Sequence, residues 1–447
     1  MSRFKSVIKR SGAEVPFTPQ RILNAIYRAA VAVGGRDRNK AEELTEKVIA
    51  YLEETLPDGY TPHVEEVQDA VEKILIENTH AKTAKAYILY REERAQLRSQ
   101  RENLDIRSSI NIPWEKIWQV LDWAAAHDLH TLEKYNQRIR KGEICQVVSE
   151  SEMFYEEDVK SAALEIEARR HKLKIVLISG PSSSGKTTTT IRIGQKLNQM
   201  GISLVALNVD NYFFDLDQHP QDEFGDYDFE PPQALDLALI NDHLTRLIAG
   251  EEVKTPFYDF KKGRRHDNQT PLRIKENDVI LIDSLHGLYE PMTENIDPEQ
   301  KYKLYLEPLL QMKGTDGQYI RWTDIRLMRR MLRDEAFRAY DLEKTLTHWH
   351  YVRSGEMRHI IPNNIYADLI INSAMPYEIS IYKPLLFNNF KKWEQKYQGD
   401  ALRLDAFVRA RRISAMLADI EPLTDDSIVP GDSVIREFIG GSTLNYR

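Results

Sequence analysis

A loop of small residues follows the apolar run KLKIVLIS, reads GPSSSGKTT and extends from Gly180 to Thr188. Its spacing fits GxxxxGK[ST], in which glycines let backbone N–H groups curl around a phosphate. The helix that should follow adds its positive N-terminal end to the same site. We therefore predict a phosphate-binding loop whose nucleotide contacts come from Gly180, Ser182, Ser183, Ser184, Gly185, Lys186, Thr187 and Thr188.

Side chains at four positions carry the expected chemistry. Lys186 would reach the β- and γ-phosphates and act in catalysis, and the Thr187 hydroxyl would ligate Mg²⁺. Two aspartates close later β-rich runs, Asp210 in SLVALNVD and Asp283 in DVILID. Because ligands gather at the carboxyl ends of parallel strands, we expect Asp283 beside Mg²⁺ and Asp210 as the base that accepts a hydroxyl proton. The alternative for Asp210 is a helix cap or turn.

A basic run, RLMRRMLRDEAFR, places Arg326, Arg329, Arg330 and Arg333 at i, i+3, i+4 and i+7, on one face of a helix. Four guanidinium groups on one stripe repel one another unless anions lie beside them. Phosphoryl transfer needs such donors, so we predict a lid over the phosphates, with Arg330 at the nucleotide and Arg333 in catalysis. A solvated helix face is the alternative.

The elements that must position these residues alternate along the chain. From Lys172 onward, β-rich runs such as KIVLIS, SLVALNV and DVILIDS are separated by amphipathic helices. This alternation predicts an α/β fold, a doubly wound parallel sheet of the P-loop NTPase type with helices on both faces. The first hundred residues predict a hairpin around Ser11-Gly12 followed by helices. Residues 98–170 have helical patterns and no recognisable chemistry.

Composition indicates a globular chain with more than one core. The 447 residues are 42% hydrophobic and 29% charged, which predicts two or more domains. No run of eighteen apolar residues and no signal peptide is found, and Cys145 is the single cysteine. We therefore expect a cytoplasmic protein without a membrane partner. A net charge of -8 argues against nucleic acid as a partner.

Residues from about 175 to 385 resemble the phosphoribulokinase/uridine kinase family of P-loop kinases, on GPSSSGKTT, NVDNYFF, YDFEPPQALD, PFYDF, LIDSLHGL and RRMLRD. Further stretches, among them FRAYDLEKTLTHWHYVRSGE and VPGDSVIREFIGGS, extend a resemblance to bacterial uridine-kinase-like nucleoside kinases from about residue 130 to the end. The front end, VIKRSGAEVPFTPQRI and the helices up to AKAYILYREER, resembles an ATP-cone.

These resemblances imply an ATP- and Mg²⁺-dependent kinase that phosphorylates a primary hydroxyl of a nucleoside. They imply contacts with the acceptor from Glu230, Tyr258 and Arg338, and we add Tyr212 to this set. They also imply a regulatory site for ATP or dATP that is lined by Val7, Lys9, Arg10 and Arg21. The implied domains are a cone over 1–97, a helical connector over 98–170, a kinase over 171–390 and a helical extension over 391–447 packed on the kinase. We also expect a homo-oligomer.

The chain departs from the family at two further positions, and the second of them leaves the acceptor open. Tyr340 stands where another lid arginine is common, and Gly263 stands where uridine kinases present a histidine to the base. A sugar or other polyol is therefore the alternative acceptor. A nucleotide-sensing protein that binds without transfer is a further alternative, although a binding-only site needs no base at Asp210. For the front end, the alternative is a plain helical interaction domain.

Overall fold

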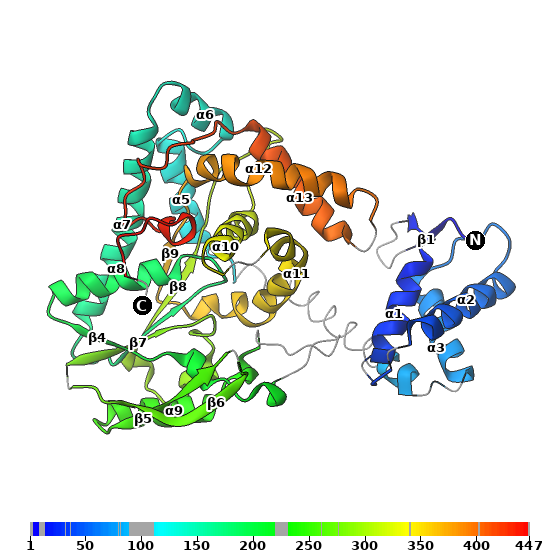
Figure 1. Ribbon diagram of the computed structural model, residues 1–447, viewed down its shortest axis with the longest axis horizontal. Helices are drawn as coiled ribbons and strands as arrows, with labels where there is room; N and C mark the ends of the chain where they lie inside the picture. The colour runs from blue at the N-terminus through cyan, green and yellow to red at the C-terminus, as the bar shows by residue number, and fades with distance from the viewer. Residues whose placement is uncertain are drawn as a thin grey trace. The chain divides into compact units, whose positions relative to one another are not determined.

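The computed structural model describes residues 3–8, 14–31, 33–35, 37–78, 80, 82–88, 111–219, 231–260, 262–275, 277–338, 341–400 and 403–445, without the side chains of 337 and 338. The chain forms two compact units (Figure 1). The first consists of Met1–Ser109 with His219–Asp228, and the second of Ile110–Gln218 with Phe229–Arg447.

The first unit is a short hairpin followed by helices. Strands β1 (Ser6–Ile8) and β2 (Glu14–Pro16) pair antiparallel, and the turn expected at Ser11-Gly12 lies outside the described residues. Its helices are α1 (Pro19–Val31), α2 (Arg38–Thr55) and α3 (Val64–Glu77). Proline is tolerated at the first helical position because its missing N–H would have no partner there, and α1 begins at Pro19. One apolar face of each helix builds the small core, for example Ile22, Val48 and Val71.

The second unit contains the predicted parallel sheet. Five strands lie in the order β4-β7-β3-β8-β9, and every neighbouring pair is parallel. The strands are β3 (Ile175–Ser179), β4 (Ser203–Ala206), β7 (Asp278–Asp283), β8 (Lys301–Glu307) and β9 (Leu369–Asn372). The prediction of an α/β fold with a parallel sheet is confirmed. The strand before the phosphate loop, β3, is central, which places the loop at the middle of the carboxyl edge.

Helices cover both faces of this sheet. Side chains alternate along β3, so that Val176 and Ile178 enter one apolar core and Ile175 and Leu177 enter another. The second of these cores is closed by α9. The helices of the unit are α5 (Trp114–Ala126), α6 (Leu132–Arg140), α7 (Ile144–Ala168), α8 (Lys186–Gln199), α9 (Leu237–Ile248), α10 (Trp322–Arg338), α11 (Leu342–His359), α12 (Glu378–Tyr397), α13 (Leu404–Asp419) and α14 (Arg436–Ile439).

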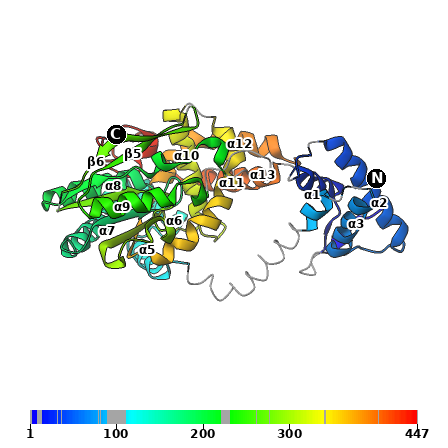
Figure 2. The same cartoon turned by 90° about the horizontal axis from the view of Figure 1, so that it is seen from below.

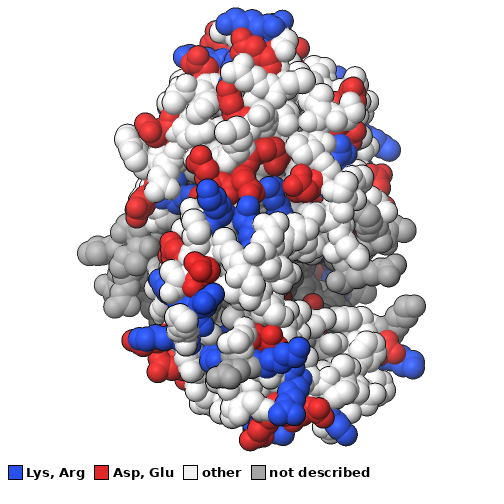
Figure 3. Space-filling model, turned by 90° about the vertical axis from the view of Figure 1, so that its left-hand side faces the viewer, with Lys and Arg blue, Asp and Glu red and all other residues white. Residues whose placement is uncertain are grey.

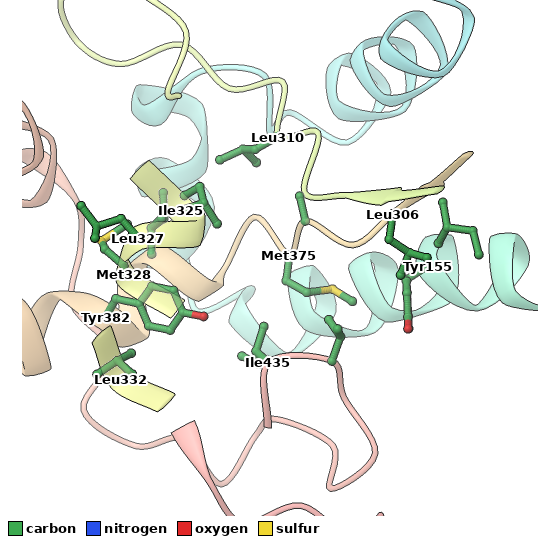
Figure 4. Close-up of a cluster of buried hydrophobic side chains, with 14 of the residues drawn as sticks. Tyr155, Leu306, Leu310, Ile325, Leu327, Met328, Leu332, Met375, Tyr382 and Ile435 are labelled. Carbon is green, nitrogen blue, oxygen red and sulfur yellow. The ribbon is translucent and has the colours of Figure 1, made fainter. Parts of the chain in front are cut away.

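Helices α5, α6 and α7, which precede the sheet in sequence, belong to its larger core. Val159 and Ile166 of α7 are fully buried in the same cluster as the sheet residue Leu306. Figure 4 shows Tyr155 of α7 beside Leu306, and its hydroxyl lies 2.6 Å from Thr189 Oγ1 on α8. The region without recognisable chemistry therefore supports the helix that follows the phosphate loop.

A separate hairpin, β5 (Val253–Asp259) with β6 (Arg264–Leu272), pairs antiparallel beside α9 (Figure 2). On the face shown in Figure 3, acidic and basic side chains are intermixed rather than gathered by sign. Arg192 of α8 lies 2.5 Å from Glu156 of α7. Among the described helices, none combines the length and the apolar character needed to cross a bilayer.

We predict that Ile166→Ala lowers the free energy of unfolding of the second unit by about 2–5 kcal/mol, because it leaves a cavity in the core shared by α7 and the sheet. Leu164→Ala on the same helix is the matched control, since Leu164 is 46% exposed, and should cost less than about 1 kcal/mol. All six tryptophans lie in the second unit, so urea unfolding followed by tryptophan fluorescence reports on it. Equal losses for the two variants would contradict a shared core.

Candidate active site

The loop between β3 and α8 has the geometry of an anion cradle. Gly185 immediately precedes α8 with a φ of 89°, a left-handed conformation that glycine adopts at little cost. At Gly180 a Cβ atom would lie 2.3 Å from the Leu306 carbonyl oxygen, so any side chain would push the loop away from β8. The loop is therefore held close to the sheet, with the N-terminus of α8 directed at it.

Polar groups inside the loop fit a phosphate ligand. The hydroxyl groups of Ser183 and Ser184 are buried and have no hydrogen-bond partner within the described chain. Lys186 Nζ donates to the loop's own Gly180 carbonyl oxygen at 2.9 Å. Burial lowers the pKa of Lys186, while Asp283 and Glu437 oppose that fall. A half-buried cation beside unused hydroxyl donors suits a polyanionic ligand.

A buried ion pair clamps the loop at Ser182. The Ser182 N–H donates to Glu356 Oε1 at 3.0 Å, and Arg326 donates to the Ser182 carbonyl oxygen at 3.1 Å. Arg326 and Glu356 also bond each other twice, at 2.5 and 2.9 Å. Burial raises the pKa of Glu356, but Arg326 and Arg353 outweigh that effect and hold the pKa below its usual value. The pair joins α10, α11 and the phosphate loop.

The prediction that all four arginines on one face of α10 form a phosphate lid is wrong for Arg326 and Arg329. Both side chains are fully buried. Arg329 bonds Glu378 at 2.7 and 2.9 Å and the Ser373 carbonyl oxygen at 2.6 Å, and the Ser373 hydroxyl donates to Ser184 of the loop at 2.5 Å. The anions that neutralise these two guanidinium groups are carboxylates of the protein itself.

Of the other two arginines of the face, Arg330 reaches the loop and Arg333 reaches Glu437, which in turn bonds Thr188 of α8. Arg330 donates to the Ser182 hydroxyl at 3.2 Å and to Asp334 at 3.3 Å. Arg333 lies 3.7 Å from Glu437 near the end of the chain, and its side chain is 19% exposed. Arg330 and Arg333 thus border the cradle, and their expected roles toward a nucleotide stay predictions.

Two carboxylates at the carboxyl edge of the sheet interact with Lys186. Burial raises the pKa of Asp283 to about 6, Lys186 opposes the rise, and Glu437 and Asp210 add to it. Asp210 lies in a short 3₁₀ turn, Val209–Tyr212, after β4. The Asp210 side chain is exposed to solvent. Nearby protein atoms nevertheless desolvate the carboxylate and raise its pKa, while the charge of Lys186 lowers it. Asp210, Asp283 and Lys186 therefore share one electrostatic environment.

The residues at this edge fit a nucleotide-bound Mg²⁺. Within the described ranges, no three His, Cys, Asp or Glu side chains come together as a metal site of their own. Mg²⁺ that travels with phosphates needs only one or two protein oxygens, because phosphates and water supply the others. Asp283 offers a carboxylate, and Thr187 is exposed at the start of α8. These are the two residues expected to hold the ion.

Two tyrosines near Asp210 are buried. Tyr212 is fully buried and its hydroxyl lies 2.8 Å from His243 of α9, which anchors the turn. Its expected contact with the acceptor stays a prediction. Tyr258 is 2% exposed, and its ring lies 5.7 Å from Phe213 and 4.8 Å from Phe260. Its N–H donates to Asn211 at 3.2 Å, which ties the β5–β6 hairpin to the Asp210 turn.

Several expected site residues are not placed by the structure. Glu230, Lys9 and Arg10 lie outside the described residues, as does the side chain of Arg338. In the first unit, Val7 is on β1 opposite Val15, and Arg21 is exposed on α1.

Sequence reasoning missed two carboxylates that hold the loop. Glu356 accepts from Ser182, and Glu437 accepts from the Thr188 N–H at 3.2 Å and from its hydroxyl at 3.0 Å. Glu437 is 249 residues from Thr188 in the chain, so no local spacing connects them. The motif stretches that contain them, HYVRSGE and REFIGGS, were visible in the sequence but carried no assigned chemistry.

Comparisons with known proteins separate the chain into two matched segments. Residues 5–96 match the ATP cone domain, and residues 175–380 match the Phosphoribulokinase / Uridine kinase family. A uridine kinase of Bacillus pumilus is 30% identical over 45% of this chain and 87% of its own length. A uridine kinase of Deinococcus deserti is 28% identical over 44% of this chain and 86% of its own. A solved structure from Bacillus stearothermophilus aligns over 48% of this chain and 98% of its own, at 15% identity and a TM-score of 0.28.

The division of the arginine face predicts that Arg329→Met destabilises the second unit by about 3–5 kcal/mol, because Glu378 would be left buried without its partner. Arg321→Met is the matched control, since Arg321 is exposed just before α10, and should change stability by no more than about 0.5 kcal/mol. Urea unfolding followed by tryptophan fluorescence measures both. If Arg329→Met unfolded like the unmodified protein and lost only nucleotide affinity, the lid interpretation would be right after all.

Proposed function

Since the chain belongs to the phosphoribulokinase/uridine kinase family, we propose that it transfers the γ-phosphoryl group of ATP to a primary hydroxyl of a nucleoside. Membership of this family makes the chain a phosphotransferase with an alcohol group as acceptor. The nucleoside as acceptor, and control of the reaction through the cone, are the parts that belong to the proposal.

One observation carries the proposal. A phosphate cradle with a half-buried lysine lies at the same edge of the sheet as two carboxylates whose pKa values respond to that lysine. A site that only bound nucleotide would need the cradle and the lysine, but not a second carboxylate without a metal to hold. Asp210 is therefore the residue that distinguishes transfer from binding.

The proposed roles follow from charge and position. Lys186 exchanges the Gly180 carbonyl oxygen for the β- and γ-phosphate oxygens, and Arg333 neutralises charge that develops on the transferred group. Asp210 accepts the proton of the acceptor hydroxyl as that oxygen attacks phosphorus. The clamp at Ser182 keeps the loop from moving while charge shifts, which is the condition for catalysis by preorganised donors.

Thr187 and Asp283 would hold the Mg²⁺ that accompanies ATP. When bound, this ion would neutralise part of the charge on the phosphates.

The acceptor would bind between the Asp210 turn and the β5–β6 hairpin. Phe213, Tyr258 and Phe260 form an aromatic group there, which supports an acceptor with a ring to stack. Glu230 would hold vicinal hydroxyl groups. At Gly263 a Cβ atom would lie 2.8 Å from Leu216, so the histidine expected of uridine kinases has no room. That observation favours a sugar or another polyol as the second candidate acceptor.

We predict that one class of acceptor raises ADP release well above the background ATPase rate when purified protein is screened against nucleosides, sugars and polyols. Asp210→Asn should keep ATP affinity while acceptor-dependent turnover falls by about a hundredfold or more, because the proton acceptor is lost.

Asp217→Asn serves as the matched control, since Asp217 is 58% exposed and near the same turn. A sugar response without a nucleoside response would favour the second candidate. If no acceptor raised ADP release while ATP still bound normally, the protein would bind nucleotide without transferring a phosphoryl group. That result would contradict the proposed function.

We further propose that the first unit senses ATP or dATP and adjusts the kinase reaction, which the match of residues 5–96 to the ATP cone domain supports. Its expected ligands, Val7, Lys9, Arg10 and Arg21, include three cations and no base. Such a site would bind a triphosphate without turning it over. A sensing site influences activity only if its ligand prefers one state of the protein.

A variant that begins at residue 102 should keep phosphoryl transfer and lose its response to dATP. In the full-length protein, Lys9→Ala combined with Arg10→Ala should produce the same loss. The measurement is the rate against dATP concentration at fixed ATP, and the full-length response should be about fivefold to hundredfold. If the truncated and full-length proteins responded identically to dATP, the first unit would not regulate the reaction. It would then be a plain helical interaction domain.

A further inference from the structure

The segment Ser433–Ile439, near the end of the chain, packs directly on the phosphate loop. A Cβ atom at Gly185 would lie 2.4 Å from Val434 Cγ2, so this segment and the loop touch at the residue where α8 starts. Figure 1 shows the chain end beside α8, and Figure 4 shows Ile435 in the buried cluster that contains Met375. The segment is part of the site rather than a tail.

Glu437 in this segment occupies donors that a P-loop ordinarily gives to its ligand. Its Oε2 accepts from the Thr188 N–H at 3.2 Å and from the Thr188 hydroxyl at 3.0 Å. Its Oε1 lies 3.7 Å from Arg333, and the residue is only 8% exposed. One carboxylate thus engages an amide of the first turn of α8, a hydroxyl of the same turn, and a guanidinium group.

These donors have the arrangement of an anion site already filled by an anion. Amides in the first turn of α8 have no intrahelical partner and carry the positive end of the helix, so either a phosphate or a carboxylate can bind them. A nucleotide in the loop brings a phosphate to the same amides. Two anions cannot share one N–H, and they repel each other in a buried site.

We propose that Glu437 is an internal substitute for a nucleotide phosphate, which nucleotide must displace from Thr188 and Arg333 in order to bind. This inference rests on the proposed function, because it assumes that the loop binds nucleotide. It goes further by making the C-terminal segment a determinant of nucleotide affinity.

The motion required is that of one side chain. The backbone on either side of Glu437 is anchored, since Val434, Ile435 and Phe438 are fully buried. Arg436 also donates to the Asp426 and Val429 carbonyl oxygens at 2.7 and 2.9 Å. Glu437 therefore turns away while the segment stays, and its ion pair with Arg333 breaks at the same moment.

The test is calorimetric titration of full-length protein with Mg·ADP. Glu437→Gln keeps the shape and removes the charge, and Glu437→Ala removes the competitor, so both should bind Mg·ADP about tenfold more tightly than the unmodified protein. Glu421→Gln is the matched control, because Glu421 pairs with Arg140 away from the loop, and should not change affinity. Circular dichroism establishes that the variants are folded.

Weaker or unchanged Mg·ADP binding by folded Glu437 variants would overturn the inference, because Glu437 would then support the loop rather than compete for it. Absence of Mg·ADP binding by the unmodified protein would instead overturn the proposed function. If neither variant folds, a crystal structure of the unmodified protein with Mg·ADP decides. It should show a phosphate oxygen on the Thr188 N–H with the Glu437 carboxylate displaced, whereas Glu437 retained there would refute the proposal.

Discussion

The buried ion pair between Arg326 and Glu356 is the interaction on which the site depends. Glu356 accepts from the Ser182 N–H, and Arg326 donates to the Ser182 carbonyl oxygen. Both polar groups of this loop residue are therefore fixed by the same ion pair. Buried charges are costly unless paired, which means that α10, α11 and the loop must be in register for any of them to be stable there. The shape of the loop is therefore determined by packing far from it in sequence.

The same principle extends across the face of α10. Arg329 is neutralised by Glu378 and reaches the loop through Ser373, while Arg330 and Arg333 are left at the border of the cradle. Two arginines thus build the site and two border it. This division lets the loop present donors to a ligand without relying on that ligand for its conformation, which is what preorganised charge stabilisation requires.

The phosphate loop and the parallel sheet could be predicted from sequence, because short-range patterns of residues determine both. The glycine spacing, the apolar run of β3 and the strand end at Asp283 followed from periodicity and motif, and the parallel sheet followed from the alternation of β-rich runs with helices. Asp210 was expected to close a strand, but β4 ends at Ala206 and Asp210 lies in the 3₁₀ turn that follows. The helical spacing of the arginines was also right, as was the inference that anions must lie beside them. That the anions are Glu356 and Glu378 was not predictable, because burial and partners of a helix face are set by tertiary contacts.

The unforeseen burial of Tyr212 and the omission of Glu437 have the same cause. Tyr212 is two residues from Asp210, and only its bond to His243 of α9 shows that it points into the core. Glu437 lies at the opposite end of the domain from the P-loop in sequence, and the fold alone brings it to Thr188. Closeness in sequence to Asp210 gave no sign that Tyr212 is buried, and distance in sequence from Thr188 concealed Glu437.

The central claim is that this cradle transfers phosphoryl groups to an alcohol, and isotope tracking tests it most directly. Protein incubated with [γ-³²P]ATP and an accepted hydroxyl compound should yield the label in an organic phosphate monoester, in a one-to-one ratio with ADP. Label recovered only as inorganic phosphate would mean that water is the sole acceptor. That result would contradict the account.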